Sequence, residues 1–166
     1  MGLDRLAGVE GFGPLARRDS PRARGGHSIE SPKDIRILLV DDDFADAEHT
    51  LEALSIHGLG EAVRIARGGQ EALDYLFGHG QFAARRRYPM PDLVLLDLNM
   101  PGTDGFAVLR QVRRSEGLRR IPVIALCTSV EDGARCMTSA SPADRYIVKP
   151  VTVDDLSGLA GWTEVL

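Results

Sequence analysis

The sequence predicts an α/β protein in which helices cover both faces of a parallel β-sheet. The first observation is that short apolar runs and segments of helical spacing alternate five times along the chain. The second is that runs such as LVLLDL at residues 93–98 are continuous rather than alternating, which is typical of strands buried on both faces. Because crossovers are right-handed, we expect the doubly wound, flavodoxin-like (βα)5 fold with strand order 2-1-3-4-5.

Each strand is predicted from a short apolar run, and each helix from apolar residues three or four positions apart. In the first helix, Phe44, Ala47, Leu51 and Leu54 mark one face, and Gly58 ends it. In chain order, the predicted strands are DIRILLV (34–40), AVRIAR (62–67), PDLVLLDL (91–98), IPVIALC (121–127) and DRYIVKP (144–150). The predicted helices are FADAEHTLEALSIHG (44–58), GGQEALDYLFGHG (68–80), FAVLRQVRRSEG (106–117), Glu131 to Ala140, and VDDLSGLAGWTEVL (153–166). A polar loop containing Arg85-Arg86-Arg87 leads to the third strand.

The first 33 residues differ from this pattern, so we place the domain at residues 34–166. They contain six glycines and three prolines without apolar periodicity, and six basic against four acidic residues. This composition predicts a disordered N-terminal extension. GFGPLA at 11–16 could form a nucleotide loop, but no strand precedes it and Pro14 lies inside it. The arginines could contact an acidic partner or a membrane, although a solvated linker explains them more simply.

Size and composition exclude several classes of protein. A chain of 166 residues with 43% apolar and 27% charged residues fits one soluble domain plus some excess. The net charge of −4 gives no reason to expect a DNA-binding surface, and no apolar run approaches the ~20 residues of a membrane span. No signal peptide is apparent at the N-terminus. Two cysteines, Cys127 and Cys136, form neither a metal cluster nor a disulfide framework, so we expect a cytoplasmic protein.

Charged side chains gather at the carboxyl ends of the predicted strands, where ligands bind in open α/β sheets. Asp41 and Asp42 follow the first strand, Asp97 ends the third, and Lys149 ends the fifth. Three converging carboxylates repel one another unless a cation lies among them, and oxygen ligands with bound water suit Mg²⁺. A metal ion and a lysine beside a carboxylate can position a phosphoryl group, so Asp97 is a candidate nucleophile that forms an acyl phosphate.

Several of these residues also have ordinary structural explanations. Asp43 is a candidate N-cap for the helix that begins at Phe44. Asp104 before Gly105 is better explained as a turn or cap residue than as a metal ligand. A lysine before a proline, such as Lys149, means little by itself. The functional interpretation therefore depends on all the features occurring together, in the right strands and in the right order.

Residues 35–166 resemble the receiver domain of two-component response regulators. The resemblance rests on ILLVDDD, DLVLLDLNMPGTDG, IPVIALCTS and YIVKP, with the family's spacing from Asp97 to Lys149. It implies that Asp97 accepts a phosphoryl group from a sensor histidine kinase. It also implies a signalling protein rather than an enzyme, apart from self-catalysed phosphoryl transfer and hydrolysis. The chain is most similar to the single-domain regulators paired with phytochrome kinases. This similarity rests on the long loop from Gly80 to Pro91, together with YPMPDLVLLDLNMPGTDGFAVLRQVRR and IPVIALCTS.

The resemblance also assigns a role to each residue of the expected site. Asp42 is implied as a direct Mg²⁺ ligand, with Asp41 acting nearby or through water. Asp97 and the backbone carbonyl of Asn99 are implied as further ligands. Lys149 is expected to contact the phosphoryl oxygens.

One position departs from the family pattern. The family has Ser or Thr at the end of the fourth strand, where the hydroxyl couples the phosphoryl group to a switch aromatic, here Tyr146. Counting without gaps puts Cys127 at that position, and Thr128 follows it. A thiol is a weak donor, so we expect phosphorylation to be retained and switching to be weakened, unless the loop offers Thr128 instead. Cys127 could equally be a small core residue. Pro142 predicts an altered loop before Tyr146.

We expect the output to be protein contact. The chain ends with the helix after Asp154-Asp155, so no DNA-binding effector domain is expected to follow. Receivers commonly pair through the face made by the fourth helix, fifth strand and last helix, and a homodimer through that face is a candidate. Leu159, Trp162 and Val165 are the candidate exposed apolar residues there, although Trp162 could also be a core residue.

Two other functions compete with this one. The first is a phosphatase of the haloacid-dehalogenase kind, because Asp41 and Asp43 have its Asp-x-Asp spacing, although Ala45 and the position of Asp97 fit it poorly. The second is a receiver-shaped binding module that is never phosphorylated, which Cys127 favours and the four charged residues of the site oppose. Labelling with phosphate separates them, since the receiver carries label on Asp97 and the phosphatase on Asp41.

Overall fold

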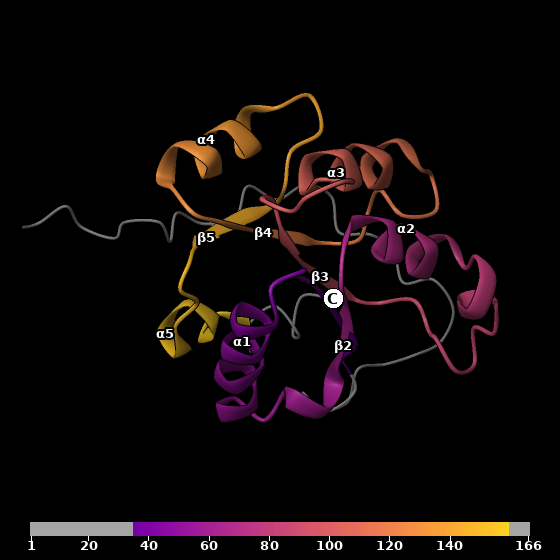
Figure 1. The fold of residues 1–166 in the computed structure, drawn as a ribbon, viewed down its shortest axis with the longest axis horizontal. Coiled ribbons are helices and arrows are strands. Elements are labelled where there is room, and N and C mark those ends of the chain that lie inside the picture. The colour runs from indigo at the N-terminus through magenta and orange to yellow at the C-terminus, as the bar shows by residue number, and fades with distance from the viewer. Residues whose placement is uncertain (1–34, 160–166) are drawn as a thin grey trace, which may run out of the picture.

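The computed structural model describes residues 35–159 (Figure 1). The expected N-terminal extension at 1–33, and the candidate contact residues Trp162 and Val165, lie outside the described residues.

The five strands form one parallel sheet in the order β2-β1-β3-β4-β5, which confirms the predicted flavodoxin-like topology. The order reverses at β1, which pairs with β2 on one side and β3 on the other. This reversal is the place where ligands bind in such sheets. The strands are β1 (Ile37–Val40), β2 (Val63–Ala66), β3 (Leu93–Asp97), β4 (Val123–Cys127) and β5 (Arg145–Val148).

Helices cover both faces of the sheet, as Figure 1 shows, with α2, α3 and α4 on one face and α1 and α5 on the other. Each predicted helix is present, but several ends differ by one or more residues from the prediction, and residues 160–166 of the last predicted helix lie outside the described residues. None of the described helices is long and apolar enough to span a bilayer. The helices are α1 (Phe44–Ile56), α2 (Gly69–Phe77), α3 (Gly105–Arg114), α4 (Val130–Thr138) and α5 (Val153–Leu156), with short 3-10 helices η2 (Gly60–Ala62) and η3 (Gly80–Ala83).

Alternate residues of each central strand point to opposite faces of the sheet, and both faces are buried. In β1, Leu38 and Val40 join the core under α2, α3 and α4, whereas Ile37 and Leu39 join the core under α1 and α5. All four are almost completely buried. The continuous apolar runs in the sequence therefore reflect two cores that share one sheet.

Two apolar residues differ in burial from what their positions in the sequence indicate. Phe44 shares the helical spacing of Ala47, Leu51 and Leu54, but it is 67% exposed, while Ala47 and Leu54 are buried. It is the first residue of the helix, and its ring lies under the guanidinium of Arg67 instead of against the sheet. Leu159 was expected to be exposed, yet it is 1% exposed and packs in the core under α1 and α5.

The segment between α2 and β3 was predicted as a polar loop, but it carries a small aromatic cluster. Phe82 of η3 is buried, and its ring contacts Tyr75 of α2 and Tyr88, with centroid distances of 5.2 and 5.1 Å. Arg85 donates hydrogen bonds to the carbonyls of Tyr75 and Leu76, which lie in the last turn of α2. These contacts give the long loop a defined structure of its own.

Candidate functional site

The site lies where β1 and β3 end side by side. The two strands pair in register from Ile37↔Leu93 to Val40↔Leu96, so Asp41 and Asp97 occupy the next position on each strand. Both aspartates are buried, whereas Asp42 is exposed. The prediction that these side chains converge at one edge of the sheet is confirmed.

The three carboxylates are close enough to share one cation. Each of Asp41, Asp42 and Asp97 offers an oxygen, and these oxygens lie within 4.8 Å of one another. A set of carboxylate oxygens without sulfur or imidazole suits a hard divalent ion such as Mg²⁺. Of the three carboxylates, that of Asp42 is exposed to water, whereas the other two are buried.

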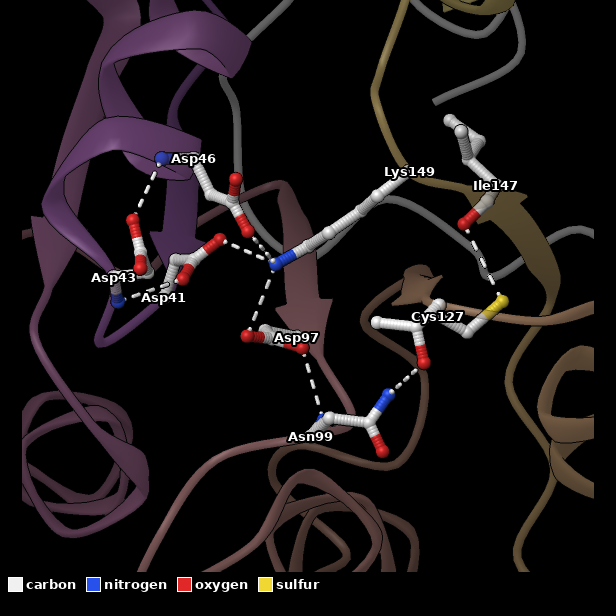
Figure 2. Close-up of polar contacts among 9 residues, drawn as sticks. Asp41, Asp43, Asp46, Asp97, Asn99, Cys127, Ile147 and Lys149 are labelled. Carbon is white, nitrogen blue, oxygen red and sulfur yellow. Dashed lines mark hydrogen bonds and ion pairs between the residues drawn. The ribbon is translucent and has the colours of Figure 1, made fainter.

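Lys149 brings a positive charge to this cluster from the end of β5 (Figure 2). Its side chain extends from beyond the end of β5 to the carboxylates, with its Nζ 2.9 Å from Asp41 Oδ2 and 3.1 Å from Asp97 Oδ2. The lysine is held at its base by a hydrogen bond from its backbone N–H to the carbonyl of Cys127, and its bond to Pro150 is cis. Its side chain is only 10% exposed. The buried Asp97 therefore meets the cation that its position in an apolar strand requires.

Burial and charge act in opposite directions on these groups. Burial raises the pKa of Asp41 from 3.8 to about 6, although the hydrogen bond and charge of Lys149 lower it. Burial by itself would lower the pKa of Lys149, but its bonds to Asp41 and Asp46 and the charge of Asp97 raise it above its ordinary value. Lys149 is thus held as an ammonium. Its charge only partly offsets the effect of burial on Asp41, so a further cation nearby would favour the ionised form of that carboxyl group.

Asn99 links Asp97 to the loop after β4. Its backbone N–H donates to Asp97 Oδ1 at 2.9 Å, and its side-chain Nδ2 donates to Thr128 Oγ1 at 3.1 Å. Thr128 is exposed. Of the two candidates for the switch hydroxyl position, Thr128 is the one joined to Asp97 through hydrogen bonds.

Cys127 points the other way. Its thiol is buried and donates to the carbonyl of Ile147 in β5 at 3.4 Å, and Figure 2 shows it directed away from Asp97. Burial raises the pKa of the thiol, which keeps it protonated. It packs in the core with Cys136, and both cysteines are free.

Tyr146 lies against α4, where Gly133 makes room for it. A Cβ atom at position 133 would overlap the Tyr146 ring, so this close approach requires glycine. The ring is half-buried and packs against the core under α4. Cys127 and the Tyr146 ring therefore both face the core beneath α4.

The structural explanations of two aspartates are confirmed. Asp43 caps α1 by accepting a hydrogen bond from the backbone N–H of Asp46, and Asp104 caps α3 by accepting one from Ala107. Neither belongs to the three-carboxylate cluster.

One contact of the site was not predicted. Asp46, in the first turn of α1, places its Oδ2 3.0 Å from Lys149 Nζ. The sequence did show that this aspartate follows the N-cap Asp43 by three residues, in the first turn of the helix that begins beside the cluster. Its relation to Lys149 could not be predicted from the sequence, because the two residues are 103 positions apart.

Comparison with known proteins gives the family. The family model for the response regulator receiver domain matches residues 37–160. Among curated relatives, the probable methanogenesis regulatory protein FilR2 of Methanothrix harundinacea is 37% identical over 131 residues, which are 79% of this chain and 82% of FilR2. Response regulator Rcp1 of Synechocystis is 33% identical over 120 residues, which are 72% of this chain and 80% of Rcp1.

Solved structures agree with this assignment. The bacteriophytochrome response regulator RtBRR matches with a TM-score of 0.72 and 39% identity, covering 80% of this chain and 79% of RtBRR. The Mn(2+)-bound form of Rcp1 matches with a TM-score of 0.65 and 31% identity, covering 80% of this chain and 96% of Rcp1. The chain therefore belongs to the response regulator receiver domain family of signalling proteins, is similar to phytochrome-associated regulators, and shares a family whose typical mode is phosphorylation by a histidine kinase.

Proposed function

We propose that Asp97 is the residue that accepts the phosphoryl group. The observation that carries this proposal is the position of its carboxylate, buried at the end of β3, with Lys149 at 3.1 Å and oxygens of Asp41 and Asp42 within 4.8 Å. In the reaction, an Asp97 oxygen forms a bond to phosphorus while the bond from phosphorus to the kinase histidine breaks. Lys149 neutralises charge on the phosphoryl oxygens.

The residues present fit a resident divalent ion. Asp41, Asp42, Asp97 and the backbone carbonyl of Asn99 would hold it. When bound, Mg²⁺ would neutralise charge on the phosphoryl oxygens and on the carboxylates. The convergence of three carboxylate oxygens within 4.8 Å supports this assignment, because a cation among them offsets their mutual repulsion. The relative Rcp1 has been solved in a Mn(2+)-bound form, and we propose Mg²⁺ for this chain because few protein ligands plus water suit that ion.

We further propose that this protein keeps the chemistry of its family and switches weakly. A thiol at 127 is a weaker donor than a hydroxyl, and in its present orientation it bonds the carbonyl of Ile147 rather than facing Asp97. Thr128, joined to Asp97 through Asn99, is the hydroxyl we assign to the phosphoryl side. Tyr146 would then respond to phosphorylation less than it does where the hydroxyl is at the end of β4.

The partners follow from the same assignment. Receivers of phytochrome-associated regulators partner with sensor histidine kinases, and we propose a kinase of the phytochrome type as the donor. We propose output through protein contact without DNA or membrane binding, with the α4-β5-α5 face as the candidate homodimer surface. In this proposal, residues 1–33 are an extension outside the receiver domain, and the free thiols Cys127 and Cys136 favour the cytoplasm.

The test is incubation with acetyl phosphate and Mg²⁺, followed by intact-mass analysis of the wild type and of Asp97→Asn. We expect the wild type to gain one phosphoryl group and the variant to gain none. A phosphoryl group mapped to Asp41 would support the phosphatase instead. No gain by either protein would support the unphosphorylated binding module.

A further inference from the structure

We propose that Asp46 is a positioning residue that holds the ammonium of Lys149 at the phosphoryl site. This inference rests on the proposed function of Asp97 and adds a residue outside the four segments that carry the family resemblance. Asp46 Oδ2 lies 3.0 Å from Lys149 Nζ, in addition to the bonds that the lysine makes to Asp41 and Asp97.

The geometry shows that Asp46 and Asp97 do not compete for the lysine. A lysine ammonium has three N–H donors, and here one position of Nζ satisfies three carboxylates at 2.9, 3.0 and 3.1 Å. In Figure 2, Asp46 approaches Nζ from the α1 side and Asp97 from the β3 side. The position that binds Asp46 is therefore also the position that faces Asp97.

The three carboxylates that bond Lys149 differ in the other partners that they can bind. Oxygens of Asp41 and Asp97 belong to the cluster that would hold the divalent ion, whereas Asp46 is outside that cluster. Occupation of the cluster and of Asp97 would therefore leave Asp46 as the partner that remains available to Lys149. Without it, the four-carbon chain of the lysine could move its charge toward solvent.

Asp46 is itself held in place for this role. Its backbone N–H donates to Oδ1 of the N-cap Asp43, which anchors the first turn of α1. A negative charge in the first turn is also favoured by the helix dipole. Its side chain is 52% exposed, so its removal is not expected to unfold the protein.

The test measures the affinity for beryllofluoride, an analogue of the phosphoryl group, at saturating Mg²⁺. If Asp46 positions Lys149, Asp46→Asn should weaken binding by about three- to tenfold. If Asp46 acts only as a nearby negative charge, the same substitution should strengthen the binding of an anion. The sign of the change therefore separates the two explanations.

Glu48 and the conservative variant supply the controls. Glu48→Gln removes the same charge from the same helix, and Glu48 is not among the described residues that bond Lys149 Nζ. We expect Glu48→Gln to leave affinity unchanged or raise it by less than about twofold. Asp46→Glu should recover part of the loss. Equal behaviour of Asp46→Asn and Glu48→Gln would overturn the inference.

A second measurement needs no variant. In a crystal structure of the wild type with Mg²⁺ and beryllofluoride, Lys149 Nζ should bond Asp46 and the beryllofluoride together, and a lysine turned away from Asp46 would overturn the inference. The two proposals can fail separately. Wild-type protein that binds no beryllofluoride would contradict the role of Asp97, whereas wild-type binding that is insensitive to Asp46→Asn contradicts only the role of Asp46.

Discussion

Over the carboxyl ends of β1 and β3, the molecule is organised by charge, whereas the neighbouring region between β4, β5 and α4 is organised by packing. In the first region, Lys149 joins three carboxylates, and two of them are buried. In the second, a buried thiol and a half-buried tyrosine ring lie against apolar residues. The two regions meet at Cys127, whose carbonyl accepts a hydrogen bond from the backbone N–H of Lys149.

Under the proposed function, this difference would let Asp97 accept a phosphoryl group without a strong conformational response. Charge neutralisation depends on a few ionised groups at defined distances, and all of them are present in the first region. A conformational switch needs two packings of similar free energy and a ligand that favours one of them. In the second region, the Tyr146 ring fits closely into the space left by Gly133.

The largest expected effect is on the charged region. Lys149→Met leaves buried carboxylates without their ammonium, so the free energy of unfolding without metal should fall by about 3–5 kcal/mol. Mg²⁺ should restore part of the loss, because it neutralises the same cluster. Chemical denaturation with and without Mg²⁺ measures both effects.

Arg36 supplies the matched control. Its ion pair with Asp92 is partly exposed, with the arginine side chain 43% exposed, so Arg36→Met should cost only about 0–1 kcal/mol and should not respond to Mg²⁺. Equal losses in the two variants would mean that the Lys149 cluster is not held together as described.

The next effect is a dependence of stability on pH in the metal-free protein. The pKa of Asp41 is about 6 in the folded state against an ordinary value of 3.8, so the folded state binds more protons between these values. The contribution of Asp41 to the free energy of unfolding should therefore fall, on the order of 1–3 kcal/mol, as pH rises from about 4 to above 6. The raised pKa of Lys149 adds stability that is lost only at alkaline pH.

Asp41→Asn is the reference for that measurement, made by urea denaturation across the pH range. The variant should lack the part of the pH dependence due to Asp41. Adding Mg²⁺ to the wild type should reduce the fall, because the ion favours the ionised carboxylate. Identical pH profiles for the wild type and Asp41→Asn would contradict the raised pKa.

In the packed region between β4, β5 and α4, we predict that one substitution lowers the free energy of unfolding in the wild type and raises it in a second background. Gly133→Ala places a methyl group against the Tyr146 ring, and we expect a loss of about 1–2 kcal/mol in the free energy of unfolding. In a Tyr146→Ala background the clash is absent. There, the same substitution should stabilise the protein by up to about 1 kcal/mol, because Ala favours helix more than Gly. A loss of similar size in both backgrounds would show that the ring does not occupy this space.

The smallest expected effect is on switching. In NMR spectra, beryllofluoride with Mg²⁺ should shift the Tyr146 ring signals only slightly in the wild type and more in Cys127→Thr. A hydroxyl in place of a thiol is expected to change the population of the switched state by about two- to tenfold. Thr128→Val should remove the small wild-type response. An identical response in the wild type and Cys127→Thr would show that the thiol does not limit switching.

The sequence was sufficient for the fold and for the convergence of the charged side chains at one edge of the sheet. Continuous apolar runs and their alternation with helices predicted the sheet order, since buried parallel strands leave few topologies. Asp41, Asp97 and Lys149 could be brought together in advance because each directly follows or ends a strand, and strand ends share one edge of the sheet. The convergence of these side chains was therefore predicted from the position of each residue relative to its strand.

The sequence was a poor guide to burial for residues near the ends of helices. Phe44 has the helical spacing of a core residue but lies at the first position of α1, outside the region covered by the sheet. Leu159 was assigned to the surface, yet it packs in the core under α1 and α5. Helical spacing gives the side of a helix and not how far along it the core extends.

By itself, the sequence determined which side chains reach the carboxyl edge of the sheet, because the alternation of strands and the residues that end them are local features. Only the tertiary structure decided which atoms meet there. The bond between Asp46 and Lys149, the thiol of Cys127 turned toward Ile147, and the fit of Tyr146 against Gly133 all join separate elements. Such contacts depend on side-chain direction and helix placement, which arise from the packing of the whole domain rather than from any one segment.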